Sequence, residues 1–162
     1  MENIIVQEYE DIYKNEIIGL ILEIQQREFG INIQKEDQPD LSDIRRFYQI
    51  GNGNFWVALD DGKVIGTLSL KDIGNYKGAL RKMFVKAEYR GRDTGVAQLL
   101  LETVLAWARN HRLTEIYLGT TEKFLAAHRF YERNKFIHIP QDELPKEFPL
   151  MKVDTRFYKF LL

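Results

Sequence analysis

The feature that most constrains the fold is a succession of a strand, a long helix and a second strand. Residues 79–85 (ALRKMFV) form a short apolar run typical of a strand, and so do residues 114–120 (TEIYLGT). Residues 95–110 between them repeat apolar side chains at helical spacing. A helix that joins two strands in this way makes a right-handed crossover, so we expect the two strands to be parallel.

The remaining periodicity predicts antiparallel strands and further helices. Asp61-Gly62 between two apolar runs is a strong signal for a β-hairpin. Gly30 is expected to end a first helix, and Asp40 is expected to cap a second one that carries Tyr48. The first helix is expected at residues 11–29. The other predicted elements are strands at residues 4–6, 136–139 and 153–161 and a helix at residues 122–134. The expected fold class is α/β (α+β), with a mixed, mostly antiparallel sheet of about seven strands flanked by about four helices.

Composition narrows the class of protein further. The 162 residues suit one domain spanning residues 1–162, and the net charge is −1, with 23 Lys plus Arg against 24 Asp plus Glu. A nucleic-acid partner is not expected, because such proteins usually carry a basic excess. The absence of cysteine excludes disulfides and thiol catalysis. No apolar run approaches the ~20 residues of a membrane helix, and MENIIVQEYE lacks a signal-peptide pattern, so we expect a cytoplasmic protein without membrane contact.

Residues 90–97, RGRDTGVA, raise a more specific question. They follow a strand and precede a helix, a position where unpaired N–H groups and a partial positive charge favour phosphate. Two glycines allow close approach of the backbone to a ligand, and two arginines add donors. Asp93 opposes an anion, and either it or Thr94 is expected to cap the helix. The loop alone leaves a phosphate site and a plain helix cap equally open.

Two longer patterns resolve this ambiguity. Arg92, Gly95 and Ala97 fit the pattern Gln/Arg-x-x-Gly-x-Gly/Ala, and the helix continues with Leu-Leu-Glu and then Trp-Ala. The segment AAHRFYERNKF (residues 126–136) resembles a second helix motif, although Lys135 stands where Gly is usual and Phe124 stands near a common Asn. Together these stretches resemble the GNAT superfamily of N-acetyltransferases, and the likeness is good from about residue 55 to residue 139.

The resemblance implies that acetyl-CoA is the cosubstrate. Phe84 and Val85 would offer backbone groups to pantetheine, as an added strand would. A backbone N–H near Phe84 would stabilise the oxyanion, and Tyr131 would protonate the leaving thiolate. Without the resemblance, Tyr131 would be interpreted as a core aromatic residue. The residues expected to cradle the pyrophosphate or add charge beside it are Arg90, Gly91, Arg92, Asp93, Thr94, Gly95, Val96 and Ala97.

The sequence does not identify a general base. Many members of the family use a glutamate in the strand before the motif, but ALRKMFV holds no acid. By residue type alone the candidates are Glu28, Asp72, Glu115 and Tyr117, with a water chain or an already neutral amine equally consistent. His128 is one turn before Tyr131, where a packing role is also open. No spacing of His, Asp or Glu indicates a metal site.

The expected function is an acyltransferase activity that moves an acetyl group from acetyl-CoA to a primary amine by direct attack in a ternary complex. The alternatives are an acyl-CoA sensor without transfer and an unrelated α/β interaction domain. Residues 11–50 and 140–158 are expected to hold the acceptor. An acidic rim there would favour a cationic acceptor, although an ordinary solvated surface is also open; its members are Glu23, Glu28, Glu36, Asp37, Asp40, Asp43, Asp142, Glu143 and Glu147.

Two further expectations concern aromatic residues and assembly. Tyr9, Tyr48, Trp56 and Phe148 either line an apolar acceptor pocket or belong to the core. A homodimer through the final strand, VDTRFYKFLL, and a monomer are both open.

Overall fold

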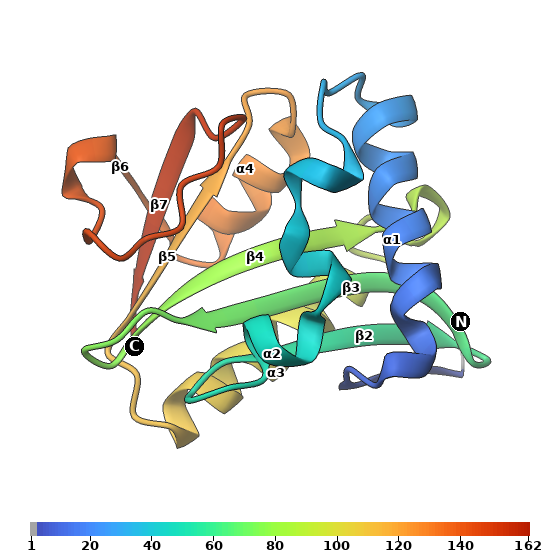
Figure 1. The fold of residues 1–162 in the computed structure, drawn as a ribbon, viewed down its shortest axis with the longest axis horizontal. Coiled ribbons are helices and arrows are strands. Elements are labelled where there is room, and N and C mark those ends of the chain that lie inside the picture. The colour runs from blue at the N-terminus through green and yellow to red at the C-terminus, as the bar shows by residue number, and fades with distance from the viewer. Residues whose placement is uncertain (1–2) are drawn as a thin grey trace.

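The computed structural model describes residues 3–162, which form a seven-stranded sheet with strand order β1-β2-β3-β4-β5-β7-β6 (Figure 1). The strands are β1 (Ile4–Glu8), β2 (Asn54–Asp60), β3 (Lys63–Asp72), β4 (Lys77–Val85), β5 (Glu115–Thr120), β6 (Ile137–Ile139) and β7 (Arg156–Leu161). The helices are α1 (Lys14–Leu22), α2 (Ile44–Tyr48), α3 (Val96–Asn110) and α4 (Leu125–Arg133). The expected fold class, a mixed and mostly antiparallel sheet with four helices, is confirmed.

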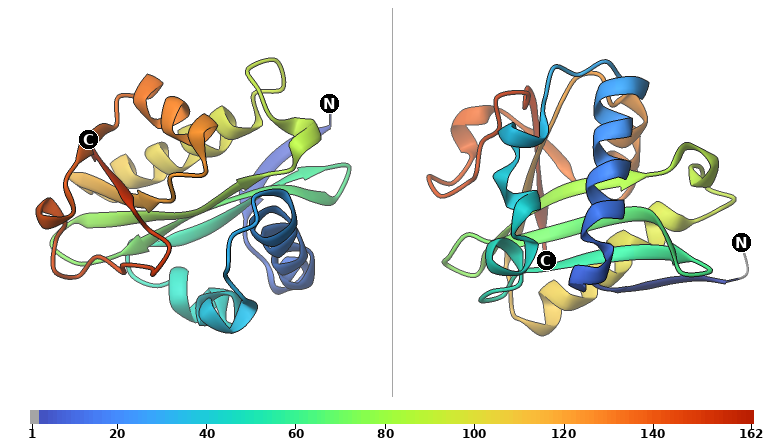
Figure 2. Two further views of the ribbon diagram at one scale, coloured as in Figure 1. Left: turned by 90° about the horizontal axis from the view of Figure 1, so that it is seen from above. Right: turned by 45° about the vertical axis from the view of Figure 1, so that its right-hand side comes forward.

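Helices cover both faces of the sheet. The view from above in Figure 2 shows α1 and α2 on one side and α3 and α4 on the other. One buried cluster joins α3 and α4 to the sheet through Leu100, Val104 and Tyr131, and a second joins α1 and α2 through Ile17, Ile21 and Tyr48. The apolar stripes read from the sequence are therefore the faces that the helices bury.

The predicted hairpin is confirmed in detail. Asp61 and Gly62 both have positive φ, at 50° and 82°, as a type I′ turn between β2 and β3 requires. Asp60 pairs with Lys63 across this turn, so the two strands keep the register that buries their apolar residues.

The strands β4 and β5 are parallel, as the crossover predicts, but they pair over only three positions. Lys77 pairs with Glu115, Gly78 with Ile116, and Ala79 with Tyr117. Beyond Ala79 the two strands diverge, as Figure 1 shows. Among residues 3–162, the edge of β4 from Leu80 to Val85 therefore has no strand partner on the β5 side.

A β-bulge interrupts β4 where it begins to separate from β5. Ser69 of β3 pairs with Arg81, whereas Thr67 pairs with Phe84, so β4 carries one extra residue in this stretch. Lys82 in the bulge has φ of 58°, a value uncommon for a non-glycine residue. The bulge directs the Lys82 side chain into the layer between the sheet and the α1–α2 side, where it is buried.

Some predicted boundaries are wrong by a few residues. Helix α4 begins three positions later than expected because Phe124 N–H bonds Thr121 O in a preceding turn. Strand β7 begins at Arg156 because Met151 and Asp154 close another turn. The first helical segment, predicted at residues 11–29, is a 3₁₀ turn at Asp11–Tyr13, then α1, then a π-helical turn at Glu23–Glu28.

Two predicted helix caps are also wrong. Helix α2 begins at Ile44, and Asp40 lies in a separate 3₁₀ turn at Pro39–Ser42, where its carboxylate accepts the Tyr48 hydroxyl at 2.5 Å. At α3 neither Asp93 nor Thr94 is the cap. Gly95 holds that position with φ of 68°, and the Thr94 hydroxyl instead donates to Gly91 O at 2.9 Å.

The final strand lies inside the sheet. β7 pairs with β5 on one side and with β6 on the other, so β6 forms the sheet edge. A dimer that adds a strand to an edge of the sheet would therefore use β6 or β1 rather than β7.

Among residues 3–162, none of the helices has the length and apolar character needed to span a membrane.

Candidate acetyl-CoA and acceptor site

The segment that connects β4 to α3 has a backbone suited to an anion. Gly91 and Gly95 have φ of 101° and 68°, so these two positions favour glycine for conformational reasons. No side chain caps the start of α3, which leaves its first N–H groups directed at the loop. Val96 is 1% exposed and anchors the helix in the core. The loop thus presents unpaired amides at a fixed helix start.

A cavity of about 840 Å³ begins at this loop and continues into the opening between β4 and β5. Phe84 and Val85 line it on the β4 side, and Gly119 and Thr120 line it on the β5 side. Of the predicted loop residues, Arg90, Gly91, Arg92, Gly95 and Ala97 also line it. Asp93 and Thr94 are not among the lining residues. Asp93 is exposed, and the Thr94 side chain is turned to Gly91.

The charge of this cavity is strongly one-sided. The cationic side chains that line it are Arg81, Lys82, Arg90, Arg92, Lys123, Arg129 and Arg133. Asp154 is the one carboxylate among the lining residues in the described range 3–162. Such a lining favours a ligand with several negative charges, as the phosphates of coenzyme A are.

Arg90 is held by the protein itself. Its guanidinium pairs with the carboxylate of Glu28, and its Nε donates to Val85 O at 2.7 Å. The hydrogen bond from Arg90 keeps the pKa of Glu28 below its usual value. Arg90 therefore ties the end of the first helical segment to the end of β4, and its charge is partly compensated before any ligand binds.

Tyr131 of α4 lines the cavity as well as belonging to the core. Its ring is 6% exposed, and its hydroxyl lies 3.4 Å from the sulfur of Met83 on β4. Burial raises the pKa of the hydroxyl, so the group remains protonated at neutral pH. The ring is thus packed in the core, and the residue also borders the gap beside β4.

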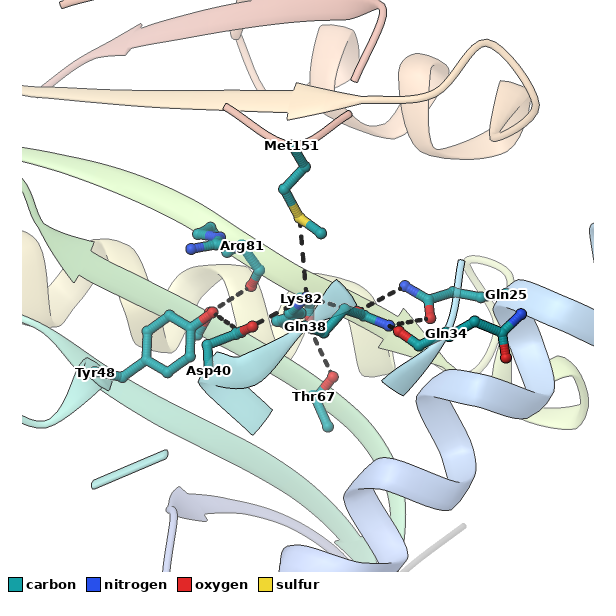
Figure 3. A network of polar contacts seen from close by, with 10 residues as sticks. Gln25, Gln34, Gln38, Asp40, Tyr48, Thr67, Arg81, Lys82 and Met151 are labelled. Carbon is teal, nitrogen blue, oxygen red and sulfur yellow. Dashed lines mark hydrogen bonds and ion pairs between the residues drawn. The ribbon is translucent and has the colours of Figure 1, made fainter. Parts of the chain in front are cut away.

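A polar network on the α1–α2 side of the sheet includes Gln25 and Lys82, which also line the cavity (Figure 3). Lys82 Nζ donates to Gln38 Oε1 at 2.7 Å and lies 3.6 Å from Asp40 Oδ2. Gln25 and Gln38 exchange two side-chain hydrogen bonds of 2.8 and 3.1 Å. Burial lowers the pKa of Lys82 to about 8, against the raising effect of Asp40. The third contact of Nζ is the sulfur of Met151 at 3.9 Å, a weak acceptor.

The base candidates chosen by residue type lie away from the cavity or are engaged. Asp72 accepts the N–H groups of Asn52 and Gly74 at the far end of β3. Glu115 pairs with Lys77 at 3.5 Å at the start of β5, opposite to the open end. Tyr117 donates to Glu115 there, and its pKa is raised to about 12 by burial.

Glu28 and His128 are also engaged in contacts with other residues. Glu28 is paired with Arg90. The His128 ring is buried beside Thr121 O, with Nε2 at 2.9 Å, and it does not line the cavity.

The acids of the expected rim are partly engaged in ion pairs. Glu23 pairs with Arg27, Asp43 with Arg46, and Asp37 with Lys152. Asp40 is buried with Lys82. The remaining acids of that set are exposed and outside the cavity lining: Glu36, Asp142, Glu143 and Glu147. None of the nine acids expected in the rim lines the cavity.

Of the four aromatic residues considered for the acceptor, Phe148 alone lines the cavity. Tyr9, Tyr48 and Trp56 are core residues with exposures of 4%, 0% and 3%.

Sequence reasoning missed several side chains that line the cavity, among them Arg81, Lys82 and Asp154. The sequence pattern places Lys82 in a strand that holds no acid and Asp154 in the final strand. The sequence did carry a signal for these two residues. Lys82 is a charged residue inside an apolar strand pattern, and Asp154 is an acid next to a strand; both are unusual in a core. Among residues 3–162 no group of three His, Cys, Asp or Glu side chains is arranged to hold a metal ion.

Comparison with known proteins places this geometry in a family. The model described as the acetyltransferase (GNAT) family matches residues 18–136. The N-acetylaspartate synthetase of Xenopus tropicalis is 39% identical over 106 residues, which cover 63% of this chain and 38% of that protein. The chain thus spans well under half the length of that relative.

Solved structures resemble the chain over nearly its whole length. A GNAT-family acetyltransferase from Staphylococcus aureus Mu50 is 40% identical, with a TM-score of 0.93, covering 96% of this chain and 97% of that one. The PaiA N-acetyltransferase of Thermoplasma acidophilum, solved in complex with coenzyme A, shares the fold at 16% identity and a TM-score of 0.74, over 98% of this chain and 99% of that one.

Proposed function

The chain belongs to the acetyltransferase (GNAT) family, and from this premise we propose that it transfers the acetyl group of acetyl-CoA directly to an amine in a ternary complex. The observation that carries the proposal is the opening between β4 and β5. It forms a single cavity that runs from the loop at residues 90–97 to Asp154, and Tyr131 lines it between these two ends. A cosubstrate and an acceptor can meet there without leaving the protein.

The cosubstrate would lie along β4. The first amides of α3 and the Arg92 guanidinium would bind the pyrophosphate. Pantetheine would run beside the unpaired edge from Leu80 to Val85 and bond to its backbone. The cationic lining of the cavity supports this placement, because it offsets the phosphate charges.

The reaction would then need a hydrogen-bond donor for the oxyanion, an acid for the leaving thiolate and a neutral amine. A backbone N–H near Phe84 would stabilise the oxyanion formed when the amine attacks the thioester carbonyl carbon. Tyr131 would donate its proton to the leaving thiolate, a role for which its protonated hydroxyl in the opening is suited.

The charge at the acceptor end supports a small acceptor that carries an anionic group as well as its amine. Arg81 lines this end. Its guanidinium carbon lies over two aromatic rings, 5.3 Å from the centroid of Phe47 and 5.9 Å from the centroid of Tyr48. Asp154 faces the same region. A zwitterion such as an amino acid would satisfy both charges, and the name N-acetylaspartate synthetase of a relative names an acceptor of that class.

Calorimetry with acetyl-CoA, desulfo-CoA and ATP tests the cosubstrate first. Tight binding of both CoA ligands with weak binding of ATP is the expected result, because the pantetheine contacts are absent in ATP. A panel of amino acids, polyamines and lysine peptides would then be assayed for acetylated product and released thiol.

Each result of this panel distinguishes one function. Acetylation of amino acids supports the proposal in full, and acetylation of polyamines alone contradicts the acceptor class. Binding of CoA without any product would identify an acyl-CoA sensor, and no CoA binding would overturn the proposal.

A further inference from the structure

Asp154 is the one negatively charged side chain that lines the cavity within the described residues. An amine acceptor in water is mostly an ammonium ion, since lysine-type amines have a pKa near ~10.4. Such a cation is repelled by the lysine and arginine side chains that line the rest of the cavity. Asp154 is therefore the position where an ammonium ion finds an ionic partner.

The carboxylate lies at the opening between the two parallel strands. It covers Gly119 of β5 so closely that a Cβ atom on Gly119 would lie 2.7 Å from Asp154 Oδ2. Gly119 is two positions past Tyr117, the last β5 residue paired with β4. Asp154 thus sits over the part of β5 that has separated from β4.

Its position is fixed by the turn that precedes β7. Met151 N–H donates to Asp154 Oδ2 at 3.1 Å, and Asp154 N–H donates to Met151 O at 3.0 Å. The next residue continues the sheet, since Thr155 N–H bonds Thr120 O at 2.9 Å. One carboxylate oxygen therefore has a backbone donor, and the other retains its capacity to accept from a ligand.

The surroundings of the carboxylate are largely buried. Desolvation raises the pKa of Asp154, opposed by the Met151 amide and by the charges of Arg81 and Lys82 on β4. Asp40 stands behind Lys82 and compensates its charge, while Gly119 on the β5 side contributes no side chain. A carboxyl group in such a place accepts a proton more readily than an exposed one.

We propose that Asp154 is the catalytic residue that binds the acceptor's ammonium group and removes its proton, an inference that rests on the acetyl transfer proposed above. The geometric basis is the coincidence of three features: Asp154 is the single carboxylate of the cavity among residues 3–162, it lies over the separated part of β5, and the Met151 amide fixes it.

The step balances as follows. The ammonium nitrogen gives one proton to the Asp154 carboxylate, and its freed electron pair forms the new C–N bond to the thioester carbonyl carbon. The tetrahedral intermediate breaks its C–S bond. The CoA sulfur takes the proton of the Tyr131 hydroxyl, and the second N–H proton, lost as the amide forms, restores that hydroxyl through water. Asp154 then releases its proton to solvent.

Asp154→Asn is the decisive variant, because an asparagine oxygen can still accept the Met151 N–H and preserve the turn. Asp61→Asn in the β2–β3 hairpin is the matched control, since it makes the same chemical change on an exposed turn. Initial rates of acetylation, with the best acceptor of the panel, would be measured for both variants and the wild type between pH 6.5 and 9.5. Acetyl-CoA affinity would be measured alongside.

The expected result is a fall in kcat of about 100-fold at pH 6.5, within the range for removal of a general base. The deficit should shrink to below about 10-fold at pH 9.5, because a rising fraction of the amine is then neutral without help. Acetyl-CoA affinity should stay within about twofold of the wild type, and Asp61→Asn should match the wild type throughout.

Two results would overturn the inference alone: a loss below about threefold at pH 6.5, or a loss of the same size at every pH, which indicates a structural defect. If the wild type binds acetyl-CoA but acetylates no amine, the proposed transfer fails, and this role fails with it.

Discussion

The ammonium of Lys82 and the carboxylate of Asp40 lie 3.6 Å apart with side-chain exposures of 3% and 4%. They join β4 to the segment between α1 and α2, which closes one side of the cavity. Tyr48 donates to the same carboxylate and Gln38 accepts from the same ammonium. The pair therefore holds together two segments that are distant in the chain.

Lys82→Met should lower the free energy of unfolding by about 3 kcal/mol, because it leaves the Asp40 carboxylate buried without its cation. The double variant Lys82→Met/Asp40→Asn should recover part of this loss. Urea unfolding measures both. Arg46→Met, which breaks an exposed pair with Asp43, should cost less than about 0.5 kcal/mol. Equal losses in the free energy of unfolding for the two pairs would show that burial does not set the cost of breaking an ion pair here.

The same lysine predicts how stability depends on pH. Its folded-state pKa of about 8 is lower than the unfolded value of about 10.4, so between these values the unfolded state binds more protons. The cost of burying charged Lys82 is present in full below pH 8 and fades as the pH rises. Wild-type stability relative to Lys82→Met should therefore rise by roughly 1.5 kcal/mol between pH 8 and 9.5 in urea unfolding. A flat or falling difference would show that Lys82 stays charged.

Tyr131→Phe should lower kcat at least about tenfold while acetyl-CoA affinity is unchanged, because the ring packing remains and only the proton donor is lost. Turnover assays and calorimetry on the same preparation measure the two quantities. Tyr158→Phe is a useful comparison, since this hydroxyl bonds Glu132 at 2.6 Å and does not line the cavity. If Tyr131→Phe turned over at the wild-type rate, its role would be packing alone.

Arg92→Ala should weaken acetyl-CoA binding about tenfold at low salt and less at high salt, because a charge-assisted contact to phosphate is screened by ions. Arg109→Ala, at the opposite end of α3, should leave the affinity unchanged, since Arg109 is exposed and outside the cavity lining. Calorimetric titrations at two salt concentrations measure the effect. Identical affinities for the two variants would remove Arg92 from the phosphate site.

The N-terminal start of α3 shows where local reasoning falls short. Asp93 and Thr94 are good cap residues by type, yet the chain enters the helix through Gly95 in a left-handed conformation. Asp40 likewise resembles a cap before an apolar run, but Lys82 and Tyr48 occupy its carboxylate. In both cases the competing partner or backbone state lies outside the short window that a cap pattern describes.

The sequence by itself determined most of the elements to within a few residues, the β2–β3 hairpin and the parallel β4–β5 pair. It could do so because the spacing of apolar residues indicates which face of each element is buried. In addition, a crossover helix between two strands requires those strands to be parallel. Only the tertiary structure decided that Lys82 meets Gln38, which is 44 positions away, and that Asp154 covers Gly119. The physical reason is that a single-residue bulge reverses the direction of a side chain and a turn places a carboxylate, while contacts between distant segments leave no periodic trace in the chain.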